Sequence, residues 1–181
     1  MGSSPRMPKT KKTYLARLAT EADKLFHGPT YQQYAAICYR PAAHADGQIE
    51  ILLITTRDSG RWAIPKGWPM DNKQPHEVAE REAWEEAGVK GKAKKRAFGF
   101  YTYLKTLDGG GKVPSVVQVH LVEVKTVDAR FPEKGQRSVR WLLPNEAAVL
   151  VREPELQSLL RRVDAKFRKP VVAAVAGRPY R

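Results

Sequence analysis

Residues Pro75 to Ala87 carry the clearest helix pattern in the chain, and this segment restricts the possible folds more than any other. Proline suits the first position of a helix, and Gly88 is the residue type that ends one in a left-handed conformation. Before the helix, residues 67–74 contain the turn formers Pro69 and Asn72, which predict a loop. The sequence therefore predicts a loop followed by a helix with a defined start and end.

Three carboxylates share one face of this helix. Glu82, Glu85 and Glu86 fall within an arc of about 100°, because residues three and four apart lie on the same side. Like charges at these spacings destabilise a helix by a few tenths of a kcal/mol each. A hard divalent cation such as Mg²⁺ binds carboxylates together with substrate phosphates and would relieve that repulsion. An acidic, solvent-facing helix surface has the same pattern, so the helix alone does not decide between the two.

The residues on both sides of the helix extend the pattern. The string GWPMDNKQPHEVAEREAWEEAGV resembles the signature of the Nudix hydrolases. That signature runs from a Gly through a Glu and an Arg-Glu pair to Glu-Glu and a closing Gly. The positions that match at the family's spacing are Gly67, Arg81, Glu82, Ala83, Glu85, Glu86, Gly88 and Val89. Lys73 stands where the family has its first Glu. That position lies outside the carboxylate cluster, so the departure puts only a structural role of that Glu in question.

The resemblance implies an α/β protein, a Nudix-type α/β/α sandwich with a mixed sheet, over residues 31–160. It implies hydrolysis of a diphosphate, in which water attacks phosphorus and Mg²⁺ (or Mn²⁺) bridges the phosphates. Metal ions suit this reaction because they neutralise charge on the bridging and leaving oxygens and lower the pKa of a bound water.

The resemblance also assigns residues. The implied metal ligands are Glu82, Glu85, Glu86 and the backbone carbonyl of Gly67. The same three glutamates are implied as catalytic, together with Arg81, which would orient one of them. The general base stays open. It is either Glu82 or Glu85, or Glu133 from a loop near the end of the domain.

Strand-like segments surround the helix. The expected strands are residues 34–39, 49–56, 61–65, 96–105, 113–124 and 138–142. A Gly-rich turn at 108–111 predicts a hairpin between the fourth and fifth of these. Helices are expected at 145–151 and 155–167, and a short one near residues 14–25. This order predicts a mixed sheet with helices on both faces.

Sequence on either side of the box gives an indication of the substrate. The strings RDSGRWAIPKGWP, AGVKGK and PEKGQRSVRWL resemble the diphosphoinositol polyphosphate phosphohydrolase branch of the Nudix enzymes. This resemblance implies inositol pyrophosphates or dinucleoside polyphosphates as small-molecule substrates. Basic and hydroxyl side chains suit phosphate binding. The candidates are Ser59, Arg61, Lys66, Lys105, Lys112 and Arg137. Each alone also fits a solvated surface residue. Trp68 is a candidate for stacking on a base.

Charge distribution bears on the other functions. The formal net charge is +13, and most of it lies in a basic N-terminal extension (1–30) and a basic C-terminal tail (161–181). Such tails can bind nucleic acid by counterion release or can be solvated. The alternative functions are therefore hydrolysis at an RNA 5′ end, hydrolysis of ADP-ribose or another nucleotide, and a silent Nudix binding module. The last conflicts with the intact carboxylate set.

Composition indicates a cytoplasmic protein. Cys38 is the single cysteine and cannot form an internal disulfide, which fits a reducing compartment. No apolar run approaches the ~20 residues that a membrane span needs, so no membrane partner is expected. The sequence does not predict the oligomeric state.

Overall fold

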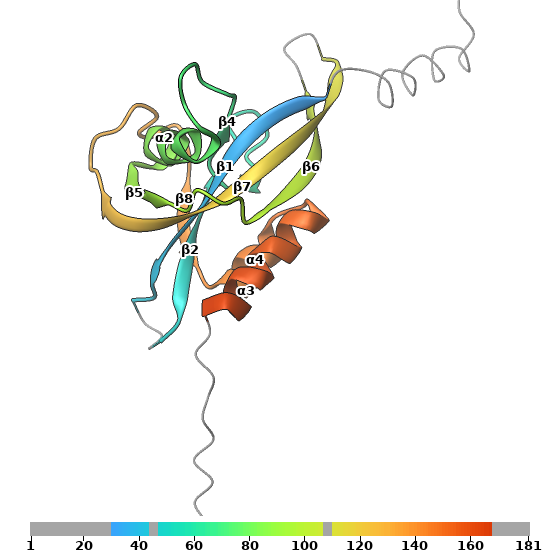
Figure 1. Ribbon diagram of the computed structural model, residues 1–181. Coiled ribbons are helices and arrows are strands. Elements are labelled where there is room, and N and C mark those ends of the chain that lie inside the picture. The colour runs from blue at the N-terminus through green and yellow to red at the C-terminus, as the bar shows by residue number, and fades with distance from the viewer. Residues whose placement is uncertain (1–29, 44–46, 107–109, 168–181) are drawn as a thin grey trace, which may run out of the picture.

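A mixed β-sheet forms the centre of the protein in the computed structural model (Figure 1). The structure describes residues 30–43, 47–106 and 110–167. The strands are β1 (Tyr31–Pro41), β2 (Ile49–Thr55), β3 (Trp62–Ala63), β4 (Lys66–Gly67), β5 (Val89–Ala93), β6 (Gly99–Thr106), β7 (Lys112–Val127) and β8 (Val139–Leu142). The helices are α2 (Pro75–Ala87), α3 (Pro144–Leu150) and α4 (Pro154–Phe167). Within this part of the chain, no helix is long and apolar enough to cross a membrane.

The sheet is mixed because of one parallel pair. β1 and β7 run parallel over nine residue pairs, from Tyr31 opposite Ser115 to Tyr39 opposite Glu123. The other pairs are antiparallel, and the main strand order is β3-β2-β1-β7-β5. β4 also pairs with β1, so the first residues of the Nudix box, which we define as residues 67–89, are fixed to the central strand.

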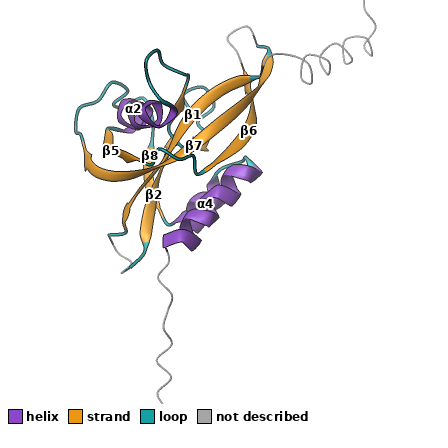
Figure 2. Ribbon diagram, viewed as in Figure 1, coloured by secondary structure: helices purple, strands orange, loops and turns teal. Residues whose placement is uncertain are grey.

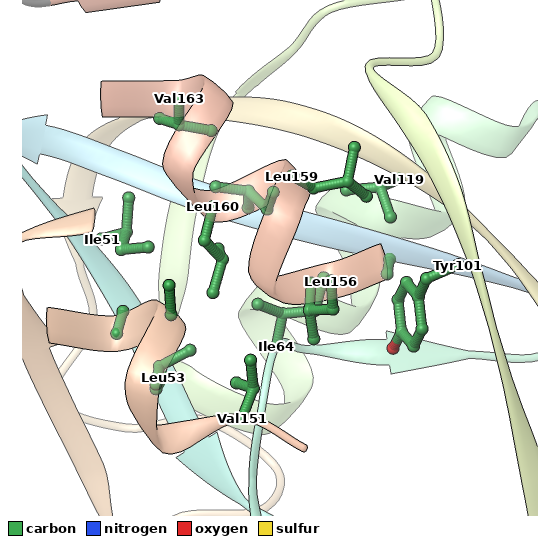
Figure 3. Close-up of a cluster of buried hydrophobic side chains, with 14 of the residues drawn as sticks. Ile51, Leu53, Ile64, Tyr101, Val119, Val151, Leu156, Leu159, Leu160 and Val163 are labelled. Carbon is green, nitrogen blue, oxygen red and sulfur yellow. The ribbon is translucent and has the colours of Figure 1, made fainter. Parts of the chain in front are cut away.

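Helices cover both faces of the sheet (Figure 2). α2 packs its alanines, Ala79, Ala83 and Ala87, against Cys38 and other apolar residues of one face. On the opposite face, α3 and α4 bury a larger cluster that contains Leu156, Leu160 and Val163 (Figure 3). The expected α/β class and the helix–sheet–helix layering are confirmed.

Local signals set the ends of α2 where the sequence places them. Pro75 occupies the first turn, and the backbone N–H of Gln74 donates to the Glu77 carboxylate at 2.8 Å. Gly88 ends the helix with φ of 70°, a conformation that glycine adopts without steric cost. A Cβ at Gly88 would also collide with Phe131, so the loop that follows β7 packs tightly against this end of the helix.

The sequence-based prediction of the other elements is correct in type but incomplete. β4 includes Gly67, the first residue of the segment expected to be a loop, and β5 was not expected as a strand. The hairpin of β6 and β7 is confirmed, while its tip at 107–109 and the predicted helix near 14–25 lie outside the described residues. α4 crosses residue 160, where the C-terminal tail was expected to begin. The division into extension, domain and tail stays a prediction.

Candidate active site

A cleft of about 450 Å³ opens beside the Nudix box. One wall is α2, which contributes Glu82, Glu85 and Glu86. The other walls come from the loop 56–61, from residues 66–70, from the end of β6 (residues 103–106), and from Glu133 and Arg137 before β8. Residues from separate parts of the sequence therefore meet at the three carboxylates.

Glu82 is the most unusual of the three. Its side chain is buried, and burial, followed by the charges of Glu86 and Glu85, raises its pKa to about 7. The nearest basic influence is Lys66, which opposes the shift only in part. A buried carboxylate with too little positive charge around it is electrostatically unfavourable, so this position would gain from a cation.

The box glycine makes room for that carboxylate. A Cβ built on Gly67 would fall on the carboxylate of Glu82, far inside van der Waals contact. Gly67 lies on β4, which is held against β1 by pairing with Tyr34. The absence of a side chain at residue 67 therefore lets the backbone of β4 lie directly against Glu82.

Gly67→Ala should consequently impair catalysis more than folding. The added methyl must push the Glu82 carboxylate aside, and a displacement of about 1 Å at a reacting centre can cost ~100-fold in rate. We expect kcat to fall by about that factor while the melting temperature changes by only a few degrees. Steady-state kinetics and thermal denaturation measure the two effects. Gly60→Ala is a suitable control, because a Cβ there meets nothing within 4 Å. Its positive φ of 61° should lower stability but leave Glu82 in place.

Glu86 is tied to the protein at both oxygens. The backbone N–H of Lys66 donates to it at 3.0 Å, and the guanidinium of Arg137 donates to its other oxygen. Burial raises the pKa of Glu86, while the charges of Lys66 and Arg137 act in the opposite direction. Glu86 therefore links β4 to the segment before β8.

Arg81 and Glu85 form the pair that the sequence implies. The Nε of Arg81 donates to Glu85 at 2.5 Å, and its guanidinium lies 4.7 Å from the centre of the Trp84 ring. Arg81 lies outside the cleft lining, whereas Glu85 is part of it. This places Arg81 behind Glu85, in the position of an orienting residue.

Arg137 connects three elements through one buried guanidinium. Its nitrogens donate to Glu86, to Glu133 at 2.7 Å, and to the backbone carbonyl of Thr55 at 3.0 Å. Its side chain is only 7% exposed. The sequence predicted Arg137 as a substrate-binding residue. The structure instead places it on these three protein groups, at the wall of the cleft.

Glu133 is held from two further sides. Its backbone N–H donates to the carbonyl of Glu85 at 3.0 Å, so the loop is fixed to α2. Its carboxylate also pairs with Arg57 at 3.5 Å. Glu133 thus lines the same cleft as the box glutamates, as the sequence proposed for an outside base.

The basic residues predicted for phosphate binding separate into two groups. Ser59, Arg61, Lys66 and Lys105 line the cleft. Lys112 does not; it lies exposed at the start of β7, opposite Thr106. Lys73, which replaces the family's first Glu, lies outside the cleft, in a shallow groove along α2.

The ammonium groups of Lys66 and Lys105 each lie near an aromatic ring. The Lys66 ammonium lies 5.7 Å from the centre of the Tyr103 ring, and that of Lys105 lies 5.3 Å from Trp68. Among the described residues, neither forms an ion pair with a carboxylate. Burial lowers the pKa of Lys66. Two ammonium groups in one cleft that form no close ion pair are suited to an anionic ligand.

Arg61 and Ser59 form another polar part of the cleft lining. The Nε of Arg61 donates to the Ser59 hydroxyl at 2.9 Å, and that hydroxyl is also 2.9 Å from the hydroxyl of Thr56. This network orients the Arg61 guanidinium at the loop before β3. Thr56 and Arg57 were not predicted as site residues, because their contacts with Ser59 and Glu133 depend on the fold.

The oxygen donors fit a hard divalent cation in kind. In the part of the chain that the structure describes, no three acidic or histidine side chains stand close enough together to hold one ion as they lie. Glu85 turns toward Arg81 and Glu86 toward Arg137. The carboxylate of Glu82 and the bare backbone of Gly67 adjoin at the centre. Carboxylates and a backbone carbonyl are the ligands that Mg²⁺ and Mn²⁺ prefer.

Two curated relatives are similar to parts of the chain. It is 32% identical to Nudix hydrolase 13, mitochondrial, from Arabidopsis thaliana over 124 residues, which cover 64% of this chain and 59% of that protein. It is 39% identical to mouse diphosphoinositol polyphosphate phosphohydrolase 3-alpha over 59 residues, 32% of this chain and 34% of that protein. The chain spans less than two thirds of the length of these curated relatives.

Solved structures and a family model agree on the fold. The Ap4A hydrolase of C. elegans superposes with a TM-score of 0.57 at 22% identity, over 76% of this chain and 98% of that one. A Nudix hydrolase from Nitrosomonas europaea gives 0.56 at 17% identity, over 79% and 94%. The family model for the NUDIX domain matches residues 33–166, which include the whole box and the cleft. The chain therefore belongs to the Nudix family.

Proposed function

We propose that this protein hydrolyses a diphosphate bond of a small-molecule polyphosphate with the help of a divalent cation. One observation carries the proposal. The same cleft holds a buried carboxylate whose charge is only partly compensated, Glu82, and two ammonium groups, Lys66 and Lys105, that form no ion pair within the described residues. A cation and a polyphosphate would satisfy both, and Nudix hydrolases generally use divalent metal ions.

The residues divide into three roles. Glu82, Glu85, Glu86 and the carbonyl of Gly67 would hold Mg²⁺ or Mn²⁺. The ion, when bound, lowers the pKa of water and neutralises the phosphate oxygens. Arg61 and Ser59, with Lys66 and Lys105, would bind the phosphates. Arg81 and Arg137 would act as positioning residues, because their guanidinium groups donate to Glu85 and Glu86.

Glu82 is the better candidate for the general base. Glu133 already accepts from Arg137 and pairs with Arg57, so its carboxylate is engaged on two sides. The Glu82 carboxylate instead adjoins the bare backbone of Gly67 within the cleft. Glu85 and Glu133 remain alternatives.

Two substrate classes follow from the sequence resemblance, diphosphoinositol polyphosphates and dinucleoside polyphosphates. ADP-ribose and other nucleotides form the second candidate class. Action at an RNA 5′ end depends on the basic tails, of which residues 1–29 and 168–181 lie outside the described residues. The cytoplasmic setting rests on the single cysteine, and the names of the plant relatives assign those proteins to organelles.

A substrate panel tests the proposal. The full chain is incubated with diphosphoinositol pentakisphosphate, diadenosine tetraphosphate, ADP-ribose and a 5′-triphosphorylated RNA, and products are followed by ³¹P NMR. We expect hydrolysis of at least one small molecule with Mg²⁺, loss of activity with EDTA, and recovery with Mg²⁺ or Mn²⁺. Equal rates in EDTA would refute the metal role. Hydrolysis of the RNA alone would favour the RNA reading, and no hydrolysis at all would favour a binding module.

A further inference from the structure

The strand β6 has one covered face and one open face. On the covered face, Tyr101 is buried in the cluster beneath α3 and α4, and a Cβ at Gly99 would meet Leu159 of α4. Side chains alternate along a strand, so Phe100 and Leu104 project to the other face, where they are 54% and 49% exposed. α2 covers that face of the sheet over other strands, and within the described residues β6 adds nothing to the cluster beneath α2 (Figure 1).

The neighbouring strand β7 continues this open face. Pro114 lies opposite Leu104, and directly opposite residues of paired strands share a face. Val116 lies opposite Thr102 on the same side, and both β7 residues are half-buried. We define the open strip as Phe100, Leu104, Pro114 and Val116. Antiparallel strands usually place polar residues on a solvated face, so an apolar strip there indicates a contact with another element.

A segment near the N-terminus carries an apolar stripe in its sequence. Residues 15–26 read LARLATEADKLF and lie outside the described residues, so the stripe is a prediction. On a helix, six of the seven apolar residues of this segment fall within an arc of about 120°. These six are Leu15, Leu18, Ala19, Ala22, Leu25 and Phe26. Arg17, Thr20 and Lys24 fall on the opposite side. An isolated helix of this length is only marginally stable, so the stripe needs a surface to pack against.

The place where this segment joins the fold favours the open strip. β1 begins at Tyr31, which lies opposite Ser115 of β7, and Ser115 in turn lies opposite Tyr103 of β6. Neighbouring strands are about 4.8 Å apart, so the segment joins the sheet about 10 Å from β6, at the end of the strip where Leu104 lies. A segment tethered so close has an effective concentration on the order of mM, which favours it over a separate partner.

The dimensions of the helix and of the strip agree. A helix over residues 15–26 is about 18 Å long, and Phe100 and Leu104 are about 14 Å apart along β6. Gly28 and Pro29, between this segment and β1, are turn formers. A turn there lets the chain reverse before β1, so that the last turn of the helix lies beside Leu104 and the first lies near Phe100.

We propose that residues 15–26 form a helix whose apolar stripe docks on the open strip of the same chain. The docked helix covers the face of β6 and β7 that α2 leaves open, on the side of the sheet opposite α4. Because Leu104 also lines the cleft, the helix adjoins the rim of the cleft. This docking does not depend on the proposed hydrolysis of a diphosphate.

Hydrogen–deuterium exchange of the full chain, followed by mass spectrometry, tests this docking. The backbone amides of residues 15–26 should exchange about 10- to 100-fold faster in Phe100→Asp than in the wild type, because burial of one large apolar side chain stabilises by roughly that factor. The amides of β1 should stay protected in both proteins, which shows that the domain is folded. Val149→Asp is the matched control and should keep the protection, because Val149 is an apolar residue of α3 that is 75% exposed outside the strip.

A second pair of variants tests the stripe itself. Leu18→Asp, within the stripe, should release residues 15–26 to the same extent, and Thr20→Asp, on the polar side, should not. The protection should not change with protein concentration or with added vesicles of anionic phospholipid. Fast exchange of residues 15–26 in the wild type, or protection that survives Phe100→Asp, would overturn the docking. Protection that appears only at high protein concentration, or only with the vesicles, would overturn it too, because the stripe would then bind a second copy or a membrane surface.

Discussion

Glu82→Gln is expected to abolish hydrolysis and, at the same time, to stabilise the metal-free protein above neutral pH. Loss of activity follows because the amide supplies no negative charge to a divalent cation and cannot accept a proton from water. The rate should fall by at least about a thousandfold, since the metal contributes several kcal/mol to transition-state stabilisation. A change that inactivates and stabilises together is the result expected for a residue kept for function.

The pH dependence gives the sign of the stability effect. The pKa of Glu82 is raised from about 4.5 to about 7 on folding, so the folded protein holds a proton there that the unfolded chain has lost. Stability therefore falls as pH rises from about 4.5 to about 7 and stays low above that. Glutamine does not titrate, so the Glu82→Gln variant does not lose stability in this way as the pH rises. The gain from Glu82→Gln should be near zero at pH 4.5 and about 1–3 kcal/mol at pH 8.

Urea denaturation of the metal-free proteins between pH 4.5 and 8 measures this difference. Glu123→Gln is a control of opposite sign, because the hydrogen bond from Lys125 lowers the pKa of Glu123 on the exposed part of β7. That control should lose a little stability at neutral pH and keep activity. A Glu82→Gln protein that is less stable than the wild type at pH 8 would contradict the uncompensated charge inferred for Glu82.

Arg137→Met should destabilise the fold by about 3–5 kcal/mol, because removing one partner of a buried ion pair leaves uncompensated charge. The guanidinium is the shared partner of Glu86 and Glu133 and also binds the carbonyl of Thr55. Methionine has a similar length but cannot donate to any of these groups. Urea denaturation at pH 8 measures the loss, and added Mg²⁺ should recover part of it by neutralising Glu86.

Arg57→Met is the matched control for Arg137. Both arginines pair with Glu133, but the Arg57 side chain is 59% exposed and its contact is 3.5 Å. An exposed pair contributes about 1 kcal/mol or less. If Arg137→Met cost no more than Arg57→Met, the buried network would not be what holds Glu86 and the loop before β8 together.

Features encoded locally could be predicted from the sequence. The ends of α2 depend on Pro75 and Gly88, and the common face of Glu82, Glu85 and Glu86 follows from helix geometry alone. Apolar runs predicted β1 and β2, and β-branched and aromatic residues on both sides of a Gly-rich turn predicted the β6–β7 hairpin. The proposal of a carboxylate site in the box therefore needed no tertiary information.

Features that depend on distant contacts could not be predicted. β4 has two residues and exists only because it pairs with β1. β5 is an edge strand beside β7 in which lysines alternate with small residues. Because of these lysines, its sequence resembles that of an exposed surface segment. Arg137 resembled a phosphate-binding arginine, yet its partners Glu86 and Thr55 lie 51 and 82 residues away in sequence. The positioning role proposed for it depends on contacts that only the folded arrangement brings together.

A direct titration with Mn²⁺ tests the central claim that the box glutamates hold the catalytic cation. Free Mn²⁺ is measured by electron paramagnetic resonance as it is added to the wild type and to a Glu85→Gln, Glu86→Gln double variant. Circular dichroism checks that both are folded. The wild type should bind at least one ion per chain and hydrolyse its substrate, and the double variant should lose both properties. Unchanged Mn²⁺ binding and unchanged hydrolysis in the folded double variant would contradict the assignment of the metal site to these carboxylates.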